Sequence, residues 1–396
     1  MSGPAQEKPG ILWIGRMLFD THLRVREVEL ARNLLDRARI YALDRSEAIA
    51  THDNSLRSRL RLRRRLLMSR FAVTDQGELT RFRMPVAAAT GPVFNRIAAW
   101  WNNRRINEAL AHFRCGHVFH GNPFFFMPEP PQRRRYRVHF DVIDNFYDEW
   151  SDGFVGRARK RFLREAMRRA DTFTACSHSL CEYAERITGR RAAYAPNGAP
   201  VQRLRAVQAH EANALRERLG LQDRFVIGFI GNHRMDFDGM EMLLDAWVPA
   251  HKARPELALL IVGPGSDKVA GPCGLGAAQG IHAVGPIPPD QVATYFHACN
   301  GGVHPYVPRP LTEDATPLNV VEFSVVGRPM LCNPLKELRR LALPNIRFAE
   351  ANAPAWTSAL LDPATFGSFD RGALVNAVTP FDWALSAQAL AREMGL

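Results

Sequence analysis

The feature that most constrains the fold is an alternation of short apolar segments with helical ones. In the second half of the chain the apolar segments are "FVIGFIG" (225–231), "LALLIVG" (257–263), "IHAVG" (281–285), "GGVHPY" (301–306), "RPMLCN" (328–333) and "IRFAE" (346–350). Helices are expected between them, at about 239–251, 290–298 and 317–326. Strands that are apolar on both faces and are separated by helices form parallel sheets covered by helices on both sides.

The first half of the chain has the same pattern. Strands are expected at 11–14, 117–121, 136–144 and 172–177, with helices at 155–169 and 178–187, and a polar segment at 200–223 connects the halves. A chain of 396 residues is long enough for two domains. We therefore expect two doubly wound domains, 1–205 and 206–378, and a final helix at 379–396. Ligands bind at the carboxyl ends of the strands in such sheets, so two facing domains would form a cleft.

The chain carries a net charge of +12, mostly from arginine in the first half. Between Asp53 and Asp75 every charged residue is an arginine: Arg57, Arg59, Arg61, Arg63, Arg64, Arg65 and Arg70. This charge indicates an anionic partner, which could be nucleic acid, an acidic membrane surface or an anionic substrate. No nucleic-acid-binding module is recognisable, so nucleic acid is the least expected of the three.

Other features of the sequence bear on the compartment. No run of 18 or more apolar residues occurs, and the first residues do not form a signal peptide, so neither a transmembrane helix nor a leader is expected. None of the six cysteines forms a CxxC pair, which disfavours structural zinc and a disulfide framework. The chain is expected in the cytoplasm or peripherally on the inner face of the membrane.

The stretch "ATPLNVVEFSVVGRPM" (315–330) places Glu322 in an otherwise apolar segment. Thr316 as N-cap, Pro317 at the first helical position and Gly327 after the last turn predict a helix at 317–326. A buried, unpaired carboxylate costs several kcal/mol, so Glu322 either reaches the surface or pairs with a cation such as Arg328 or Arg309. Free amides at the helix N-terminus suit an anion, and a carboxylate suits two hydroxyls, so the segment favours a nucleotide.

Four passages resemble GT-B glycosyltransferases of the bacterial capsule and exopolysaccharide type (group 1, family 4-like). "ATPLNVVEFSVVGRP" resembles the nucleotide-sugar motif Pro-x-Lys-x-x-Glu-x-x-x-x-Gly-x-Pro, and "FVIGFIG" resembles the first strand of the donor domain. "TACSHSLCEYAERI…YAPNGA" is similar to the passage leading into the linker, and "HFDVIDNFYD" is similar to an acceptor-domain motif of polysaccharide glucuronosyltransferases. The resemblance implies an α/β GT-B fold, with two Rossmann-like doubly wound domains facing a cleft and a C-terminal helix crossing back to the N-domain.

For the donor, the resemblance implies that Glu322 binds the nucleotide ribose while the helix N-terminus faces the pyrophosphate. The lysine of the motif is replaced by Asn319, which brings no charge. Arg234, with Arg309 second, is then the candidate for meeting the diphosphate charge. The remaining expected donor-site residues are Thr316, Pro317, Leu318, Asp314 (the first acid of the family's E-x7-E pattern) and Gly231 (the end of the first donor-domain strand).

For the acceptor, Asp141 and Asp144 stand at the end of a predicted strand. In similar polysaccharide glucuronosyltransferases the base occupies the second aspartate position, which is Asp144 here. The alternative is that Asp144 caps the following turn with Asn145. Asp20 and His22, in the first loop, are expected to contact the acceptor or the donor diphosphate.

No metal and no cofactor besides the nucleotide sugar are expected, because no Asp-x-Asp motif of the metal-binding kind follows a donor-domain strand. The nearest candidate, "DFD" at 236–238, fits a loop and a helix cap better.

The expected function is metal-independent transfer of a hexosyl or glycuronosyl group from a nucleoside-diphosphate sugar, such as a UDP-sugar. The acceptor is expected to be a hydroxyl of a saccharide or a lipid-linked acceptor in cell-surface polysaccharide synthesis. The arginines between Arg57 and Arg70 would bind an anionic membrane, with Trp100 and Trp101 as interfacial anchors. Two alternatives stay open: a UDP-sugar 2-epimerase, and a non-catalytic GT-B nucleotide-binding protein. The sequence decides neither the sugar nor whether its configuration is retained or inverted.

Overall fold

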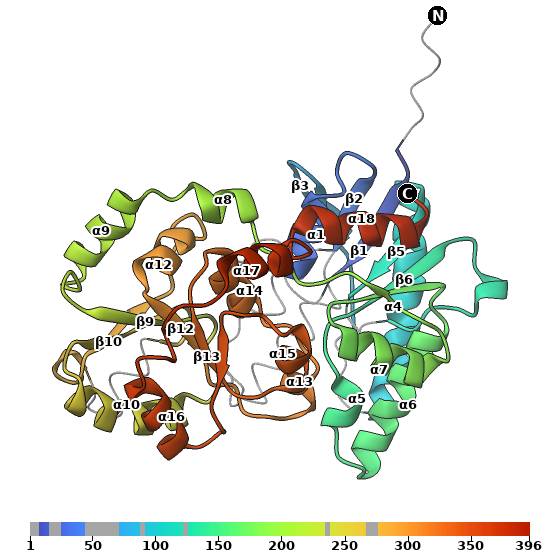
Figure 1. The fold of residues 1–396 in the computed structure, drawn as a ribbon. Helices are drawn as coiled ribbons and strands as arrows, with labels where there is room; N and C mark the ends of the chain where they lie inside the picture. Colours follow the sequence, from blue (N-terminus) through green and yellow to red (C-terminus); the bar gives the residue numbers. More distant parts are fainter. Residues whose placement is uncertain are drawn as a thin grey trace, which may run out of the picture. The chain divides into compact units, whose positions relative to one another are not determined.

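The computed structural model describes residues 8–15, 25–43, 71–87, 92–121, 126–233, 238–266 and 276–396, with the backbone alone for 92–96. The chain divides into two compact units: Met1–Ala195 together with Trp383–Leu396, and Pro196–Asp382. Each unit is a parallel or mostly parallel sheet with helices packed against it (Figure 1). The expectation of two doubly wound α/β domains is therefore confirmed.

The first unit contains an eight-stranded sheet in the order β3-β4-β2-β1-β5-β6-β7-β8. Every described strand pair is parallel except β3–β4. The strands are β1 (Gly10–Ile14), β2 (Arg39–Leu43), β3 (Ala72–Gln76), β4 (Thr80–Arg83), β5 (Cys115–His120), β6 (Arg137–Val142), β7 (Thr172–Ala175) and β8 (Ala193–Tyr194). Strands β2, β3 and β4 were not predicted, and β3 is one edge of the sheet, with β4 between it and β2.

The helices of the first unit are α1 (Arg26–Arg32), α4 (Pro92–Phe113), α5 (Phe146–Glu149), α6 (Phe154–Arg168), α7 (His178–Thr188) and α18 (Trp383–Met394), with a 3-10 turn η1 (Pro131–Arg133). Helix α7 shows how local sequence sets its limits. The Ser177 hydroxyl accepts from the Leu180 amide at 3.0 Å, and Gly189 adopts φ +74° just after the last turn. The C-terminal helix α18 packs on α1 and on β6, β7 and β8, so the chain returns to the first unit as expected.

The second unit contains a six-stranded sheet, parallel throughout, in the order β11-β10-β9-β12-β13-β14. Its strands are β9 (Phe225–Ile230), β10 (Leu257–Val262), β11 (Ile281–Gly285), β12 (Gly301–His304), β13 (Met330–Cys332) and β14 (Ile346–Phe348). All six were predicted from the apolar runs. The helices are α8 (Val201–Ala206), α9 (Ala209–Arg218), α10 (Met240–Ala253), α12 (Val292–Ala298), α13 (Pro310–Glu313), α14 (Leu318–Val325), α15 (Lys336–Leu341), α16 (Ala353–Leu361) and α17 (Arg371–Val378), with a 3-10 turn η2 (Ala277–Gln279).

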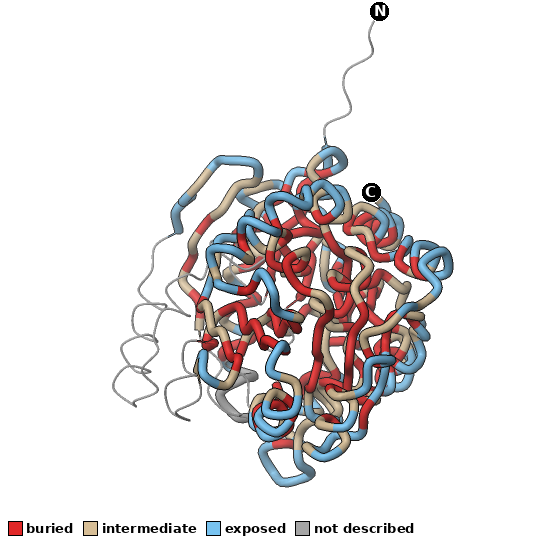
Figure 2. The backbone as a smooth tube through the Cα atoms, turned by 60° about the vertical axis from the view of Figure 1, so that its left-hand side comes forward, coloured by how far each residue is buried: buried red, intermediate tan, exposed pale blue. Residues whose placement is uncertain are grey.

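The strands form the buried centre of each unit (Figure 2). In β10 every residue from Leu257 to Val262 is completely buried, because helices cover both faces of the sheet. This explains why the strand sequence is a continuous apolar run and not an alternation. No helix in the described part of the chain is long and apolar enough to cross a membrane.

Candidate functional site

Helix α14 lies over the central strands of the second unit. Phe323, on its inner face, packs so closely on β9 and β12 that side chains at two strand positions are excluded. A Cβ atom placed on Gly302 would lie 2.7 Å from Cδ2 of Phe323, and one on Gly228 would lie 3.0 Å from its Cζ. The absence of side chains at Gly228 and Gly302 thus lets α14 approach the sheet, which fixes the position of its N-terminus.

One side of α14 is only half-buried and carries the two polar residues of the motif. Asn319 and Glu322 are half-buried, whereas Val320, Val321 and Phe323 are completely buried. Residues three apart share one face of a helix, so Asn319 and Glu322 point to the same side. Glu322 is therefore partly exposed to solvent, and this explains how a mostly apolar segment can contain a carboxylate. The Arg328 guanidinium, one of its expected partners, donates to the His297 carbonyl at 2.8 Å.

The start of α14 differs from the prediction by one residue. Pro317 is extended, with φ −69° and ψ 134°, and is itself the N-cap, so Thr316 lies before the helix. The Thr316 hydroxyl is buried without a hydrogen-bond partner, and the expectation that it caps the helix was wrong. The Asn197 side chain instead donates to the Thr316 carbonyl at 2.7 Å and holds this segment in place. The first-turn amides, including that of Leu318, receive no side-chain cap. Gly327 ends the helix with φ +70°, as predicted.

Next to Asn319 lies a histidine that the sequence analysis did not single out. His304 ends β12, is completely buried and stacks on Tyr306 with ring centroids 4.1 Å apart. Burial lowers the pKa of His304 to about 3, so the ring is neutral at physiological pH, and only the adjacent Asn319 side chain acts in the opposite direction. Neither ring nitrogen has a partner in hydrogen-bond geometry. The signal in the sequence was a titratable residue at the carboxyl end of a predicted strand.

Gly231 follows β9 and lies directly against the end of β10. Gly263 has φ +127°, and a Cβ atom on it would lie 1.8 Å from the Gly231 carbonyl oxygen. The two strand ends can therefore approach only because residue 263 is glycine. The side chain of His233 contacts the end of β10, with Nε2 at 3.1 Å from the Val262 carbonyl.

Two other expected donor-site residues, Asp314 and Arg309, form contacts within the second unit. The Lys336 ammonium is 3.1 Å from Oδ1 of the mostly buried Asp314, so this acid is paired with a cation that the sequence analysis overlooked. Arg309 is the N-cap of α13 and donates its backbone amide to the Thr312 hydroxyl at 3.0 Å. Arg234, Asp20 and His22 lie outside the described residues, as do the arginines from Arg57 to Arg70.

The "DFD" passage enters the described chain at Asp238. Its Oδ1 accepts from the Met240 amide at 3.0 Å, at the start of α10, whose N-cap is Gly239. Within the described ranges no group of three or more His, Cys, Asp or Glu side chains is placed to hold a metal ion.

In the first unit, Asp141 is held by a buried arginine. Arg26 donates from Nε to Oδ2 and from Nη2 to Oδ1 of Asp141, both at 2.8 Å, and from Nη1 to the Ala195 carbonyl at 2.7 Å. The Thr174 hydroxyl adds a bond to Oδ1 at 2.7 Å. The bidentate ion pair connects the end of β6 to the start of α1. The hydrogen bond to the Ala195 carbonyl connects Arg26 to the residue that follows β8.

The contacts of Asp141 favour a structural role. Burial alone would raise the pKa of the Asp141 carboxyl, but Arg26 and then Thr174 outweigh burial and lower it. A proton on Asp141 would break the ion pair, so of the predicted catalytic pair Asp144 is the better candidate for the base. The sequence could not reveal this, because Arg26 lies 115 residues away along the chain.

Asp144 lies two residues beyond β6 and is half-buried. It lines a small cavity with Gly121, Phe146, Leu163 and Tyr183. The next residue, Asn145, is the N-cap of α5 and accepts from the Asp148 amide at 3.1 Å. Of the two aspartates, Asp141 lies within β6 and is buried, and Asp144 lies beyond the end of the strand and is half-buried.

Solved structures share this architecture over almost the whole chain. HepE of Anabaena, in complex with UDP and glucose, matches with a TM-score of 0.68 at 14% identity, over 98% of this chain and 100% of its own. Sucrose-phosphate synthase of Thermosynechococcus elongatus matches with a TM-score of 0.69 at 15% identity, over 98% of each chain. WaaG, a glycosyltransferase involved in lipopolysaccharide biosynthesis, matches with a TM-score of 0.59 at 13% identity, over 97% of this chain and 95% of its own.

The protein has the GT-B fold. Within it, residues 224–362, which lie in the second unit, match the model of the glycosyl transferases group 1 family. TuaH of Bacillus subtilis (strain 168), assigned to teichuronic acid biosynthesis as a glycosyltransferase, is 26% identical over 231 residues. That match covers 54% of this chain and 55% of TuaH, about half of each protein.

Proposed function

We propose that the protein transfers a sugar from a nucleoside-diphosphate sugar to a hydroxyl of a saccharide or lipid-linked acceptor in cell-surface polysaccharide synthesis. The observation that carries this proposal is the half-buried side of α14. Asn319 in the first turn and Glu322 in the second share that side, on a helix that packs on central strands of the region matched by the group 1 model. HepE is described in complexes with UDP, with UDP and glucose, and with UDP-glucose, so UDP is the first nucleotide to test.

In this proposal the second unit binds the donor. Glu322 accepts hydrogen bonds from the ribose hydroxyls, and the amides after Pro317 face the diphosphate at the positive end of the helix dipole. Asn319 can donate a hydrogen bond but supplies no charge. The cation that stabilises the leaving diphosphate is then an arginine, Arg234 or Arg309, and the reaction needs no metal.

The first unit binds the acceptor. Asp144 takes the proton from the attacking hydroxyl if the transfer inverts the configuration of the sugar. Asp20 and His22 contact the acceptor in the same proposal. The enzyme acts in the cytoplasm or on the inner face of the membrane, where a lipid-linked acceptor with an anionic head group would be available.

Calorimetric titration with UDP, GDP, ADP and their sugars tests the donor site. We expect one nucleotide family to bind, and Glu322→Ala to weaken it while Glu350→Ala, which changes an exposed acid of the same unit, does not. Equal affinities in both variants would contradict the assignment of Glu322. Consumption of the donor sugar with no acceptor present, accompanied by a change at its C2 carbon, would identify a 2-epimerase instead.

A further inference from the structure

Helix α6 presents two different faces. On its inner face, Leu163 and Met167 line the cavity beside Asp144, and Phe162 and Ala166 pack on Ala99 of α4. On its outer face, exposed residues follow at alternating spacings of three and four: Phe154, Arg157, Arg161, Arg164 and Arg168. Such spacing places side chains in one stripe along a helix. The outer stripe therefore consists of four arginines with a phenylalanine at its N-terminal end.

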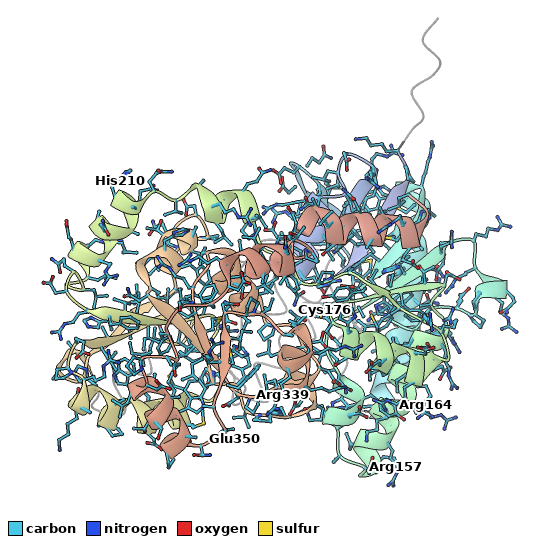
Figure 3. All side chains as sticks on the ribbon, in the orientation of Figure 1. Arg157, Arg164, Cys176, His210, Arg339 and Glu350 are labelled. Carbon is cyan, nitrogen blue, oxygen red and sulfur yellow. The ribbon has the colours of Figure 1, made fainter. Side chains whose placement is uncertain are left out.

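The arginines of this stripe are not paired with acids, and Asp152, the acid that attracts Arg157, forms its ion pair with Lys160. Arg157 donates to the Asp152 carbonyl, Arg164 to the Tyr147 hydroxyl, and Arg168 to the Ile187 carbonyl at 3.3 Å. Within the described chain none of the four forms a salt bridge with a carboxylate. Figure 3 shows Arg157 and Arg164 along α6 at the lower edge of the first unit. Four positive charges thus stay available for an anionic partner.

Large apolar side chains stand exposed beside the stripe. Phe154 and Val155 at the start of α6 are 72% and 45% exposed, and Ile97 and Trp100 on the neighbouring α4 are 61% and 63% exposed. Trp101, the other expected anchor, is partly buried under the Arg105 guanidinium, 4.7 Å from the ring centroid. Single exposed apolar residues are ordinary, but four stand on these two helices, which pack together at Ala99, Phe162 and Ala166.

A groove of about 730 Å³ lies between the two helices, lined by Trp100, Arg104, Met127, Phe162, Glu165 and Arg169. Two of the acids on its wall are paired with arginines of the same helices. Arg169 binds Glu165 at 2.5 Å, and Arg105 binds Glu108 at 2.7 Å. The groove therefore adds apolar area to this surface. Since these two acids are already paired, they do not neutralise the charge of the arginine stripe.

We propose that this surface, the α4/α6 face (Ile97, Trp100, Phe154, Val155, Arg157, Arg161, Arg164 and Arg168), docks the first unit onto an anionic lipid bilayer. Arginines next to anionic head groups are attracted to them, and exposed tryptophan and phenylalanine side chains insert at the interface. Duplex nucleic acid would use the arginines through its phosphates and would leave the four apolar side chains without a partner.

The same helix connects this surface to Asp144. Its inner face lines the Asp144 cavity, and a helix with its side chains is about 10–12 Å across. Docking through α6 would hold that cavity about one helix diameter from the lipid head groups. This step rests on the proposed function, because it gives a lipid-linked acceptor a short path to the candidate base.

Co-sedimentation with vesicles tests the proposal on the full-length protein. The vesicles are phosphatidylcholine alone and an equal mixture of phosphatidylcholine and phosphatidylglycerol, each at low and high salt. The stripe variant is Arg157→Gln/Arg161→Gln/Arg164→Gln. The matched control is Arg205→Gln/Arg218→Gln/Arg339→Gln, which removes the same charge from exposed positions of the second unit.

We expect wild type and control to bind the anionic vesicles alike and the stripe variant to bind roughly 100-fold more weakly. Each arginine near an anionic surface contributes about 1 kcal/mol, and about 1.4 kcal/mol is a factor of ten. Trp100→Ser should weaken binding at both salt concentrations, because its contribution is apolar and is not screened. Thermal unfolding of each variant, expected to match wild type, verifies that the fold is retained.

Equal loss of binding in the stripe and control variants would overturn the proposal, since net charge alone would then explain the attraction. Preference for duplex nucleic acid over anionic vesicles at physiological salt would overturn it too. UDP titration of the same variants separates the two proposals. Vesicle binding without nucleotide binding would contradict glycosyl transfer and leave the docking surface intact, and the reverse result would contradict only the docking surface.

Discussion

Replacing Arg26 by methionine should be among the most damaging single changes in the first unit. Arg26 and Asp141 are only 4% and 2% exposed, so the substitution would leave a carboxylate buried with the Thr174 hydroxyl as its remaining side-chain hydrogen-bond donor. Breaking a buried ion pair by removing one partner costs about 3–5 kcal/mol. That is a large share of the roughly 5–15 kcal/mol by which domains are stable.

Urea unfolding followed by circular dichroism measures this loss. The double variant Arg26→Met/Asp141→Leu should recover most of it, because an apolar pair of similar volume leaves no uncompensated charge. A loss below about 1 kcal/mol in the single variant, where an exposed pair would fall, would refute the reasoning. A double variant as unstable as the single one would refute it as well.

The Arg26–Asp141 pair also predicts that stability depends on pH in opposite ways in the wild type and in Arg26→Met. In the wild type the pKa of Asp141 is lowered, so its contribution is complete above the unfolded-state value of about 3.9 and is lost as the pH falls through the folded-state value. Without Arg26, burial raises the pKa of this carboxyl instead. Arg26→Met should therefore gain stability as the pH falls from neutral, whereas the wild type should not. Unfolding midpoints at a series of pH values distinguish the two trends.

Three further predictions concern the donor and acceptor sites. Glu322→Ala should weaken UDP binding by about 1–3 kcal/mol in calorimetry, and Glu322→Gln by less, because the amide oxygen still accepts a hydrogen bond. Asp144→Asn should slow sugar transfer by roughly 100-fold or more, as expected for a positioned base, with donor affinity nearly unchanged; near-normal turnover would exclude the role. Asn319→Lys should tighten UDP binding in a salt-sensitive way, since it adds a cation near the diphosphate, and an unchanged affinity would show that this position does not face the phosphates.

The second unit could be predicted from its sequence because its strands are central ones. Burial on both faces forces a continuous apolar run, and such runs are visible without knowledge of the partners. These helix ends could also be predicted, because they depend only on neighbouring residues. Ser177 and Gly189 limit α7, and Gly327 ends α14. Strands β2 to β4 of the first unit were missed; β3 is mostly exposed and β4 mostly half-buried, so neither shows a continuous apolar run.

The roles of the polar residues were decided by contacts between distant parts of the chain. Asp141 and Asp144 look alike in sequence, and only the approach of Arg26 turns the first into one half of an ion pair. Glu322 could equally have been buried, and its exposure depends on which face of α14 packs against Gly228 and Gly302. Local sequence determines the elements because backbone geometry and burial patterns are short-ranged. The chemistry of a carboxylate depends on the charges and solvent around it, and these are set only when the chain has folded.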